Sequence, residues 1–147
     1  MKISAYVDSH IEAEGQPLQM AGCGIVLLAE SGSETIKRCL GFGLSNSDRM
    51  RTLIQSLRLA LCAINQPYRQ CEVLLYNNDS ESYKLLHQIG RKYSYEYNEP
   101  FVKELRLVAD TFKDMYVVVG AESDAAAKEA AKIAHDCALS QKNYDLG

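Results

Sequence analysis

Five side chains in this sequence have types and positions that could do chemistry. Asp8 follows the first β-type run, Asp79 follows the apolar run CEVLLY, and Asp124 precedes the last helical pattern, whereas Arg49 and Arg51 open the first helix. Carboxylate oxygens are the hard ligands that Mg²⁺ requires, so the three acids are candidates for a metal site. A guanidinium has only donors, so it cannot bind a cation but can pair with phosphate or carboxylate. Two arginines in a first helical turn call for an explanation, because the helix dipole favours acids there.

The composition is that of an ordinary globular chain. It has 147 residues, of which 47% are hydrophobic and 24% are charged, and this length suits one domain with one core. We therefore expect a single domain over residues 1–141 and a frayed tail over residues 142–147. The net charge of −3 argues against a dedicated nucleic-acid binder, although an acidic protein can still carry a local basic patch.

The cysteines and histidines give no signal of a disulfide framework or a metal site. The five cysteines are odd in number and contain no C-x-x-C pair, so we interpret them as buried, reduced thiols of a cytoplasmic protein. His10, His87 and His135 are interpreted as surface residues or helix caps. No apolar run reaches the length of a membrane span, and the first ten residues do not read as a secretory signal. We expect a cytoplasmic protein without a membrane partner.

The spacing of apolar residues predicts an α/β domain. An apolar run such as residues 71–76 is typical of a strand buried on both faces of a parallel sheet. Three strands that pair as hairpins, followed by strands separated by helices, imply a mixed sheet with helices on both faces. The expected strands cover residues 3–7, 21–28, 34–41, 71–76 and 115–119, and the expected helices cover 48–64, a segment with 83–89, a segment from Pro100, and 124–140.

Several strings resemble the ribonuclease H fold over nearly the whole chain. AYVDS is similar to its first strand and AGCGIVLL to its second, while ETIKRCLGFGLSNSDRMRTLIQSLRLAL and CEVLLYNNDSES are similar to its third strand with the first helix and to its fourth strand. The resemblance implies a five-stranded mixed sheet in the order 3-2-1-4-5. It also implies cleavage of the RNA strand of an RNA–DNA hybrid by four carboxylates that hold two magnesium ions.

The first two positions of this carboxylate set give different answers. Asp8 matches the aspartate at the end of the first strand, although it could instead order the following turn. The glutamate at the start of the first helix falls on Arg49 when the helix is aligned by its apolar spacing, and on Arg51 when it is aligned on NSDRM. Asp48 is one residue away, which turns a helical side chain by roughly 100°. The sequence therefore lacks the second acid.

The third and fourth positions are weaker still. For the third position, counting along the strand gives Asn78, the string DS gives Asp79, and counting back from the next helix gives Glu81. We choose Asp79, which could equally be the N-cap of that helix. The fourth aspartate falls on Ala131, and Asp124 could replace it only if the helix register shifts.

We therefore predict a ribonuclease H-like domain that has lost hydrolysis and acts as a nucleic-acid-binding or assembly module for RNA, DNA or their hybrid. No cofactor is expected in that case. The candidate phosphate contacts are Arg49, Arg51, Lys37 and Arg38, and the competing interpretation is a salt bridge from Arg49 or Arg51 to Asp8 or Asp79.

Two further functions are compatible with the sequence. One is a protein-interaction or structural domain, with a protein partner or a second copy, which a tyrosine cluster favours because tyrosine is enriched in interfaces. The second is a magnesium-dependent ribonuclease H with a shifted carboxylate set, Asp8, Asp79 and Asp124. The tyrosines that favour the interaction domain are Tyr93, Tyr95 and Tyr97.

Overall fold

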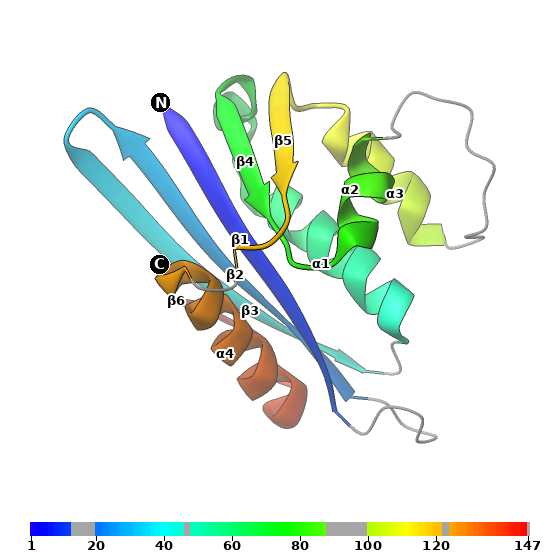
Figure 1. The fold of residues 1–147 in the computed structure, drawn as a ribbon. Coiled ribbons are helices and arrows are strands. Elements are labelled where there is room, and N and C mark those ends of the chain that lie inside the picture. Colours follow the sequence, from blue (N-terminus) through cyan, green and yellow to red (C-terminus); the bar gives the residue numbers. More distant parts are fainter. Residues whose placement is uncertain (13–19, 46–47, 88–99, 122–123, 147) are drawn as a thin grey trace.

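A mixed β-sheet organises the molecule (Figure 1). The computed structural model describes residues 1–12, 20–45, 48–87, 100–121 and 124–146. The expected tyrosine cluster lies outside these residues. In chain order the elements are β1 (Lys2–Glu12), β2 (Met20–Ser31), β3 (Glu34–Ser45), α1 (Arg49–Ala63), the 3₁₀-helix η1 (Gln66–Gln70), β4 (Glu72–Tyr76), α2 (Ser80–His87), α3 (Pro100–Ala109), β5 (Asp114–Val118), α4 (Ala125–Ser140) and β6 (Tyr144–Leu146).

The strand order confirms the predicted topology. The sheet runs β5-β4-β1-β2-β3-β6, which contains the order 3-2-1-4-5 expected from the sequence. β2 is antiparallel to both β1 and β3. β4 is parallel to β1 and β5. The carboxyl end of β4 therefore points the same way as that of β1, so residues that follow β4 can meet residues of β1.

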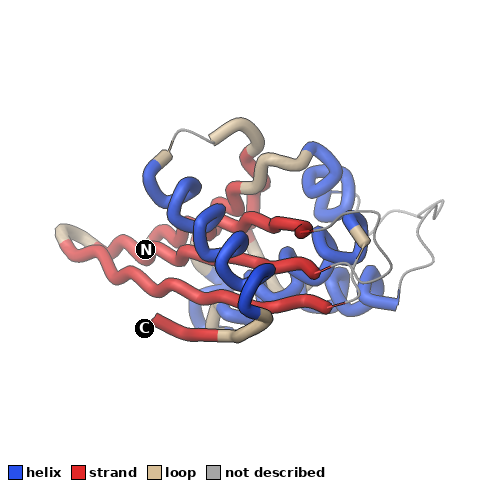
Figure 2. Tube along the Cα trace, turned by 90° about the horizontal axis from the view of Figure 1, so that it is seen from below, coloured by secondary structure: helices blue, strands red, loops and turns tan. Residues whose placement is uncertain are grey.

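The C-terminal tail corrects one expectation. Tyr144–Leu146 is not frayed but forms β6, which pairs with β3 from Gly41↔Tyr144 to Cys39↔Leu146; Figure 2 shows this strand at the edge of the sheet, beside the C-terminus. The free edge of β3 presents unpaired backbone groups that a short segment can satisfy. An ion pair of 2.6 Å between Arg38 and Asp145 adds to the pairing.

The first strand is also longer than predicted. β1 continues to Glu12, so Asp8 lies inside the strand opposite Gly24 rather than at its end. Polar residues beyond Asp8 read as a turn in the sequence, but their backbone groups pair with β2 as far as Met20. Ladder hydrogen bonds do not depend on side-chain polarity, which is why the pattern of apolar residues underestimated this strand.

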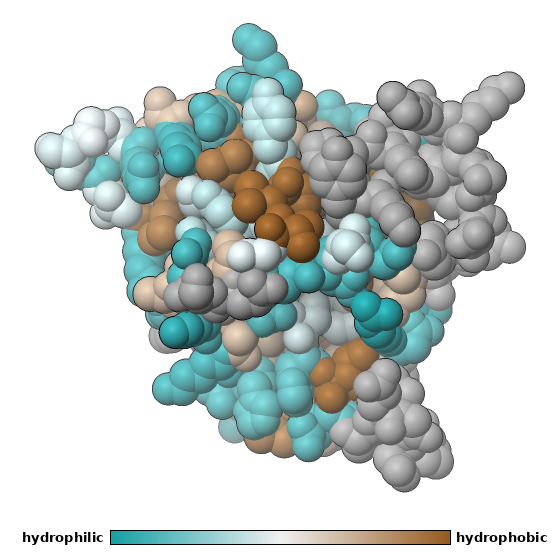
Figure 3. Space-filling model, viewed as in Figure 1, coloured by the Kyte–Doolittle hydropathy of each residue, from teal (hydrophilic) through white to brown (hydrophobic). Residues whose placement is uncertain are grey.

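Helices cover both faces of the sheet. On one face α1 packs its buried residues Leu53, Ile54, Leu57 and Leu61 into a core that also contains side chains of β1, α2 and α3. On the other face α4 packs through Ala130, Ile133, Ala134 and Cys137, as the sequence predicted. The outward surface of α4 is largely hydrophilic (Figure 3). None of the helices in the described part of the chain is long and apolar enough to cross a membrane.

Candidate functional site

A cavity of about 260 Å³ lies where β1, the start of α1 and the segment after β4 meet. Two carboxylates, Asp8 and Asp79, share its wall with the guanidinium of Arg49. The structure thus brings together the side chains that the sequence placed at the first three positions of the implied metal site. The full lining is Asp8, Ser9, His10, Ile11, Arg49, Thr52, Leu53, Asn77 and Asp79.

Two consecutive hydrogen bonds from serine hydroxyl groups connect β1 to α1. Ser9 Oγ donates to Ser56 Oγ at 2.8 Å, and Ser56 Oγ donates to the Thr52 carbonyl at 2.7 Å. Both helix residues are fully buried. Asp48 caps α1 because its carboxylate accepts from the Arg51 amide at 2.8 Å, which places an acid at the positive end of the helix dipole.

Arg49 forms an ion pair with Asp79. Arg49 Nη2 lies 2.9 Å from Asp79 Oδ2, while the side chain of Arg49 is 67% exposed and that of Asp79 is 23% exposed. Asp79 Oδ1 also accepts from the Glu81 amide at 3.0 Å, so Asp79 caps α2 as well. The salt-bridge and helix-cap interpretations are therefore both confirmed. An exposed pair of this kind contributes about 0–1 kcal/mol.

Three residues that the sequence also allowed at the second and third positions do not line this cavity. Arg51 follows Arg49 by two residues and is absent from the cavity wall, as are Asn78 and Glu81. Asn78 instead lines a smaller cavity on the α4 side of β1. The apolar spacing of α1 gave the register that puts its arginine in the cavity. The sequence did not single out Asn77, whose buried amide donates to the Val7 carbonyl at 2.9 Å and ties β4 to β1.

Asp8 is a partly buried acid of the cavity wall. Burial raises the pKa of its carboxyl, and the hydrogen bond from the Ser9 amide, 2.8 Å long, and the nearby His10 lower that pKa by less. A raised pKa in the folded state means that the charged form opposes folding. The contribution of Asp8 to the free energy of unfolding is therefore fully present at a pH below the pKa that its carboxyl has in the unfolded chain. This contribution is lost as pH rises through the higher pKa of the folded protein.

We expect Asp8→Asn to raise Tm by a few degrees at neutral pH, because the amide carries no charge to desolvate. The gain over the parent protein should shrink as pH falls through the pKa of Asp8. Asp79→Asn is the matched control and should lower Tm, because it loses the charge that Arg49 contacts. Thermal melting monitored by circular dichroism measures both; a lower Tm for Asp8→Asn would show that its carboxylate has a favourable charge partner.

The remaining acid, Asp124, belongs to a different set of contacts. Its Oδ2 accepts from the Tyr6 hydroxyl at 3.1 Å, and the Tyr6 ring stacks on Tyr76 with centroids 4.3 Å apart. Burial, followed by Asp124, raises the pKa of Tyr6 to about 12, which keeps this donor protonated. Asp124 thus lies beside Tyr6 and does not line the cavity that holds Asp8 and Asp79.

The donor set does not fit the implied pair of magnesium ions. The cavity wall offers two carboxylates, and Arg49 occupies one oxygen of Asp79. The carboxylates of Asp8, Asp79 and Asp124 do not form a group with ligand atoms all within 4.8 Å of one another. Ala131 on α4 has only a methyl group and cannot ligate.

The predicted phosphate contacts do not form one surface. Lys37 and Arg38 lie near the start of β3, whereas Arg49 and Arg51 open α1 after its end (Figure 1). Each β3 residue has a carboxylate partner: Lys37 Nζ is 2.6 Å from Glu129 of α4, and Arg38 contacts Asp145. Local charge in the sequence could not show this separation, because it depends on the direction of β3.

The comparisons with known proteins show the fold. LC9-RNase H1, described as a type 1 RNase H with the type 2 active-site motif, has a TM-score of 0.75 at 16% identity, over 97% of this chain and 74% of its own. RNase H1 from Halobacterium salinarum has a TM-score of 0.64 at 19% identity, over 97% of this chain and all of its own. The N-terminal RNase H domain of a Mycobacterium tuberculosis protein has a TM-score of 0.66 at 13% identity, over 92% of this chain and 98% of its own. No protein-family model and no curated protein matches the sequence. The chain has a ribonuclease H-like fold.

Proposed function

We propose that this chain is a catalytically defective ribonuclease H-like domain that binds nucleic acid beside the vacated metal site. The observation that carries the proposed loss of the metal site is the Arg49–Asp79 ion pair of 2.9 Å in the cavity wall. By the resemblance, a magnesium-binding glutamate would occupy the position of Arg49. A guanidinium there neutralises an acid that a metal ion would otherwise neutralise, and its charge repels a cation.

The loss of hydrolysis follows from the chemistry that two metal ions supply. They activate the attacking water and stabilise the leaving oxygen, and the protein must hold them with fixed oxygen ligands. Asp8 and Asp79 are the carboxylates of this cavity wall. The equivalents of the two remaining acids are a guanidinium and a methyl group, at Arg49 and Ala131. The protein therefore cannot assemble the metal pair.

Arg49 is also the side chain best placed to contact a phosphate. It is 67% exposed at the cavity rim, and it opens α1, where the positive end of the helix dipole favours an anion. A guanidinium can donate two parallel hydrogen bonds to a phosphate. The net charge of −3 makes this binding weak and strongly dependent on salt. An RNA–DNA hybrid is the first ligand to test, because the solved neighbours are RNase H proteins.

We expect Arg49→Ala to weaken binding of an RNA–DNA hybrid at low salt and to reduce the salt dependence of log K by about 1. Arg38→Ala is the matched control, because it removes one arginine of β3 that does not line the cavity and pairs with Asp145 of β6. Fluorescence anisotropy of a labelled hybrid, measured over a series of salt concentrations, gives both values.

The proposal fails if the hybrid does not bind at low salt, or if the two variants lose the same affinity. Concentration-dependent self-association without hybrid binding would instead favour a protein-interaction domain. Sedimentation velocity on the same samples measures that association. Asp79→Ala gives a further check: it frees the Arg49 guanidinium and should strengthen hybrid binding.

A further inference from the structure

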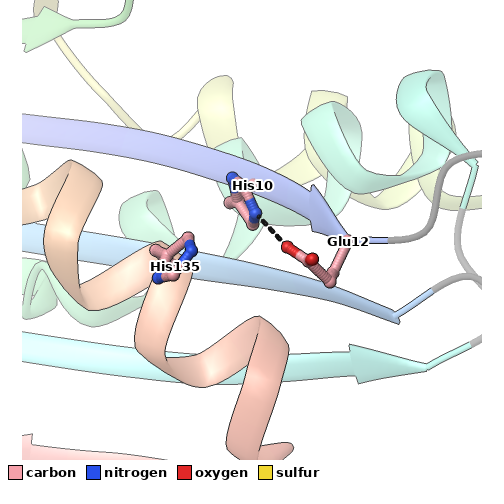
Figure 4. Close-up of side chains that lie close together, drawn as sticks. All are labelled: His10, Glu12 and His135. Atoms are coloured by element: carbon pink, nitrogen blue, oxygen red, sulfur yellow. Dashed lines mark hydrogen bonds and ion pairs between the residues drawn. The ribbon is translucent and has the colours of Figure 1, made fainter.

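Two histidines and a glutamate meet near the carboxyl end of β1. His10 Nε2 lies 2.8 Å from Glu12 Oε2, and the rings of His10 and His135 have centroids 4.5 Å apart. One ligand atom from each residue lies within 4.8 Å of the others. Figure 4 shows His10 and Glu12 on β1 beside His135 on α4. Among the described residues, this is the group of metal-binding side chains with that spacing.

The secondary structure explains why these side chains face one another. His10 and Glu12 are two residues apart on a strand, so both project from one face of β1. α4 packs on that same face, because Tyr6 of β1 contacts its core. The ring of His135 on α4 packs against that of His10, and its side chain is 50% exposed. The three ligands therefore come from two rigid elements and remain open to solvent.

The group of His10, Glu12 and His135 lies next to the positions of the implied magnesium site on both β1 and α4. On β1, His10 and Glu12 come two and four residues after Asp8, so the three side chains project from the same face of the strand. On α4, His135 follows Ala131 by one helical turn. Gly24 contacts α4 near Ala130, and Gly22, opposite His10, contacts it near Ala138. β1 and α4 thus run in the same direction where they pack. His10, Glu12 and His135 therefore lie beyond the implied magnesium site toward the carboxyl ends of both elements.

We propose that His10, Glu12 and His135 bind a zinc ion that joins β1 to α4. Two imidazoles and one carboxylate suit zinc and do not suit magnesium, which requires oxygen ligands. Ligands of a tetrahedral zinc ion lie about 3.3 Å apart, so His10 and Glu12 need only a small rotation from their hydrogen bond. The fourth position is open to water.

The charges around the group favour a cation. Asp136 Oδ1 lies 4.0 Å from His135 Nδ1, so a second carboxylate stands next to the ligand set. The side chains of His10 and Glu12 are 35% and 41% exposed, which leaves an entry path for the hydrated ion.

Titration of the full chain with ZnCl₂ by isothermal calorimetry tests the proposal. The Cys62→Ala background removes an exposed thiol that could bind zinc by itself. We expect one zinc ion per chain, and a rise in Tm of about 5–10 °C at a zinc concentration 100 times Kd. MgCl₂ should give neither effect. His10→Ala and His135→Ala, on two different elements, should each weaken zinc binding by about tenfold or more.

His87→Ala is the matched control, because it removes the third histidine of the sequence and should leave zinc affinity unchanged. Circular dichroism without metal checks that each variant folds, and Glu12→Gln gives a variant that keeps both histidines. Absence of one-to-one zinc binding would overturn the proposal. So would equal zinc affinity in the parent protein and in both His10→Ala and His135→Ala.

Discussion

An RNA–DNA hybrid incubated with the purified protein in Mg²⁺ or Mn²⁺ should remain intact, at the level of an Asp8→Ala control. Enzymes accelerate difficult hydrolyses by at least about 10⁶-fold, so a functional metal pair would be obvious in this assay. The cavity holds two carboxylates, and one of them already contacts Arg49. Gel analysis of a labelled RNA strand measures the cleavage.

Cleavage by the parent protein that disappears in Asp8→Ala would contradict this prediction and favour the shifted carboxylate set. A separate variant, Arg49→Glu, tests whether Arg49 occupies the position of the implied magnesium-binding glutamate. This substitution adds a third acid beside Asp8 and Asp79. This variant should lose up to about 1 kcal/mol of stability, since the exposed pair contributes no more. Added Mg²⁺ should then raise its Tm and leave that of the parent unchanged. An equal effect of Mg²⁺ on both would show that Arg49 does not occupy the old ligand position.

Gly24→Ala should strongly destabilise the protein, because Gly24 of β2 packs directly against the backbone of α4. A Cβ atom at this position would lie 2.0 Å from the Ala130 carbonyl oxygen and 2.8 Å from the Ala134 amide nitrogen. These are backbone atoms of α4, so the helix must move away from β2 and lose its buried contacts. We expect a loss of about 3 kcal/mol or more in the free energy of unfolding.

Gly32→Ala is the matched control for this loss. Gly32 has a φ of +62° in the β2–β3 turn, and a Cβ atom there would meet nothing within 4 Å. It should therefore cost only the strain of the left-handed backbone, about 1–2 kcal/mol. Urea unfolding of both variants gives the comparison. A loss for Gly24→Ala no greater than for Gly32→Ala would mean that α4 does not rest on β2 at this distance.

Local patterns in the sequence predicted the helices and the first five strands, and the resemblance predicted their order. Leu53, Leu57 and Leu61 recur at helical spacing, and their burial in α1 follows from that period. The small face of α4, from Ala130 to Cys137, was readable for the same reason. The spacing of apolar residues predicts burial here because helix geometry fixes the face on which each side chain lies. The face that packs on the core must be continuously apolar.

The tertiary structure alone decided which side chains share a site. Arg49 and Asp79 are 30 residues apart in the sequence, and only the fold brings their side chains to one cavity wall. The sequence treated His10 and His135 as separate surface residues or helix caps, because residues 9–12 read as a turn and only the extension of β1 to Glu12 puts His10 and Glu12 on one strand face. β6 was also missed, because its three residues pair with a strand edge and show no pattern of their own. Such contacts depend on how α4 crosses β1 and on which strand has a free edge, and no local pattern of apolar residues encodes either.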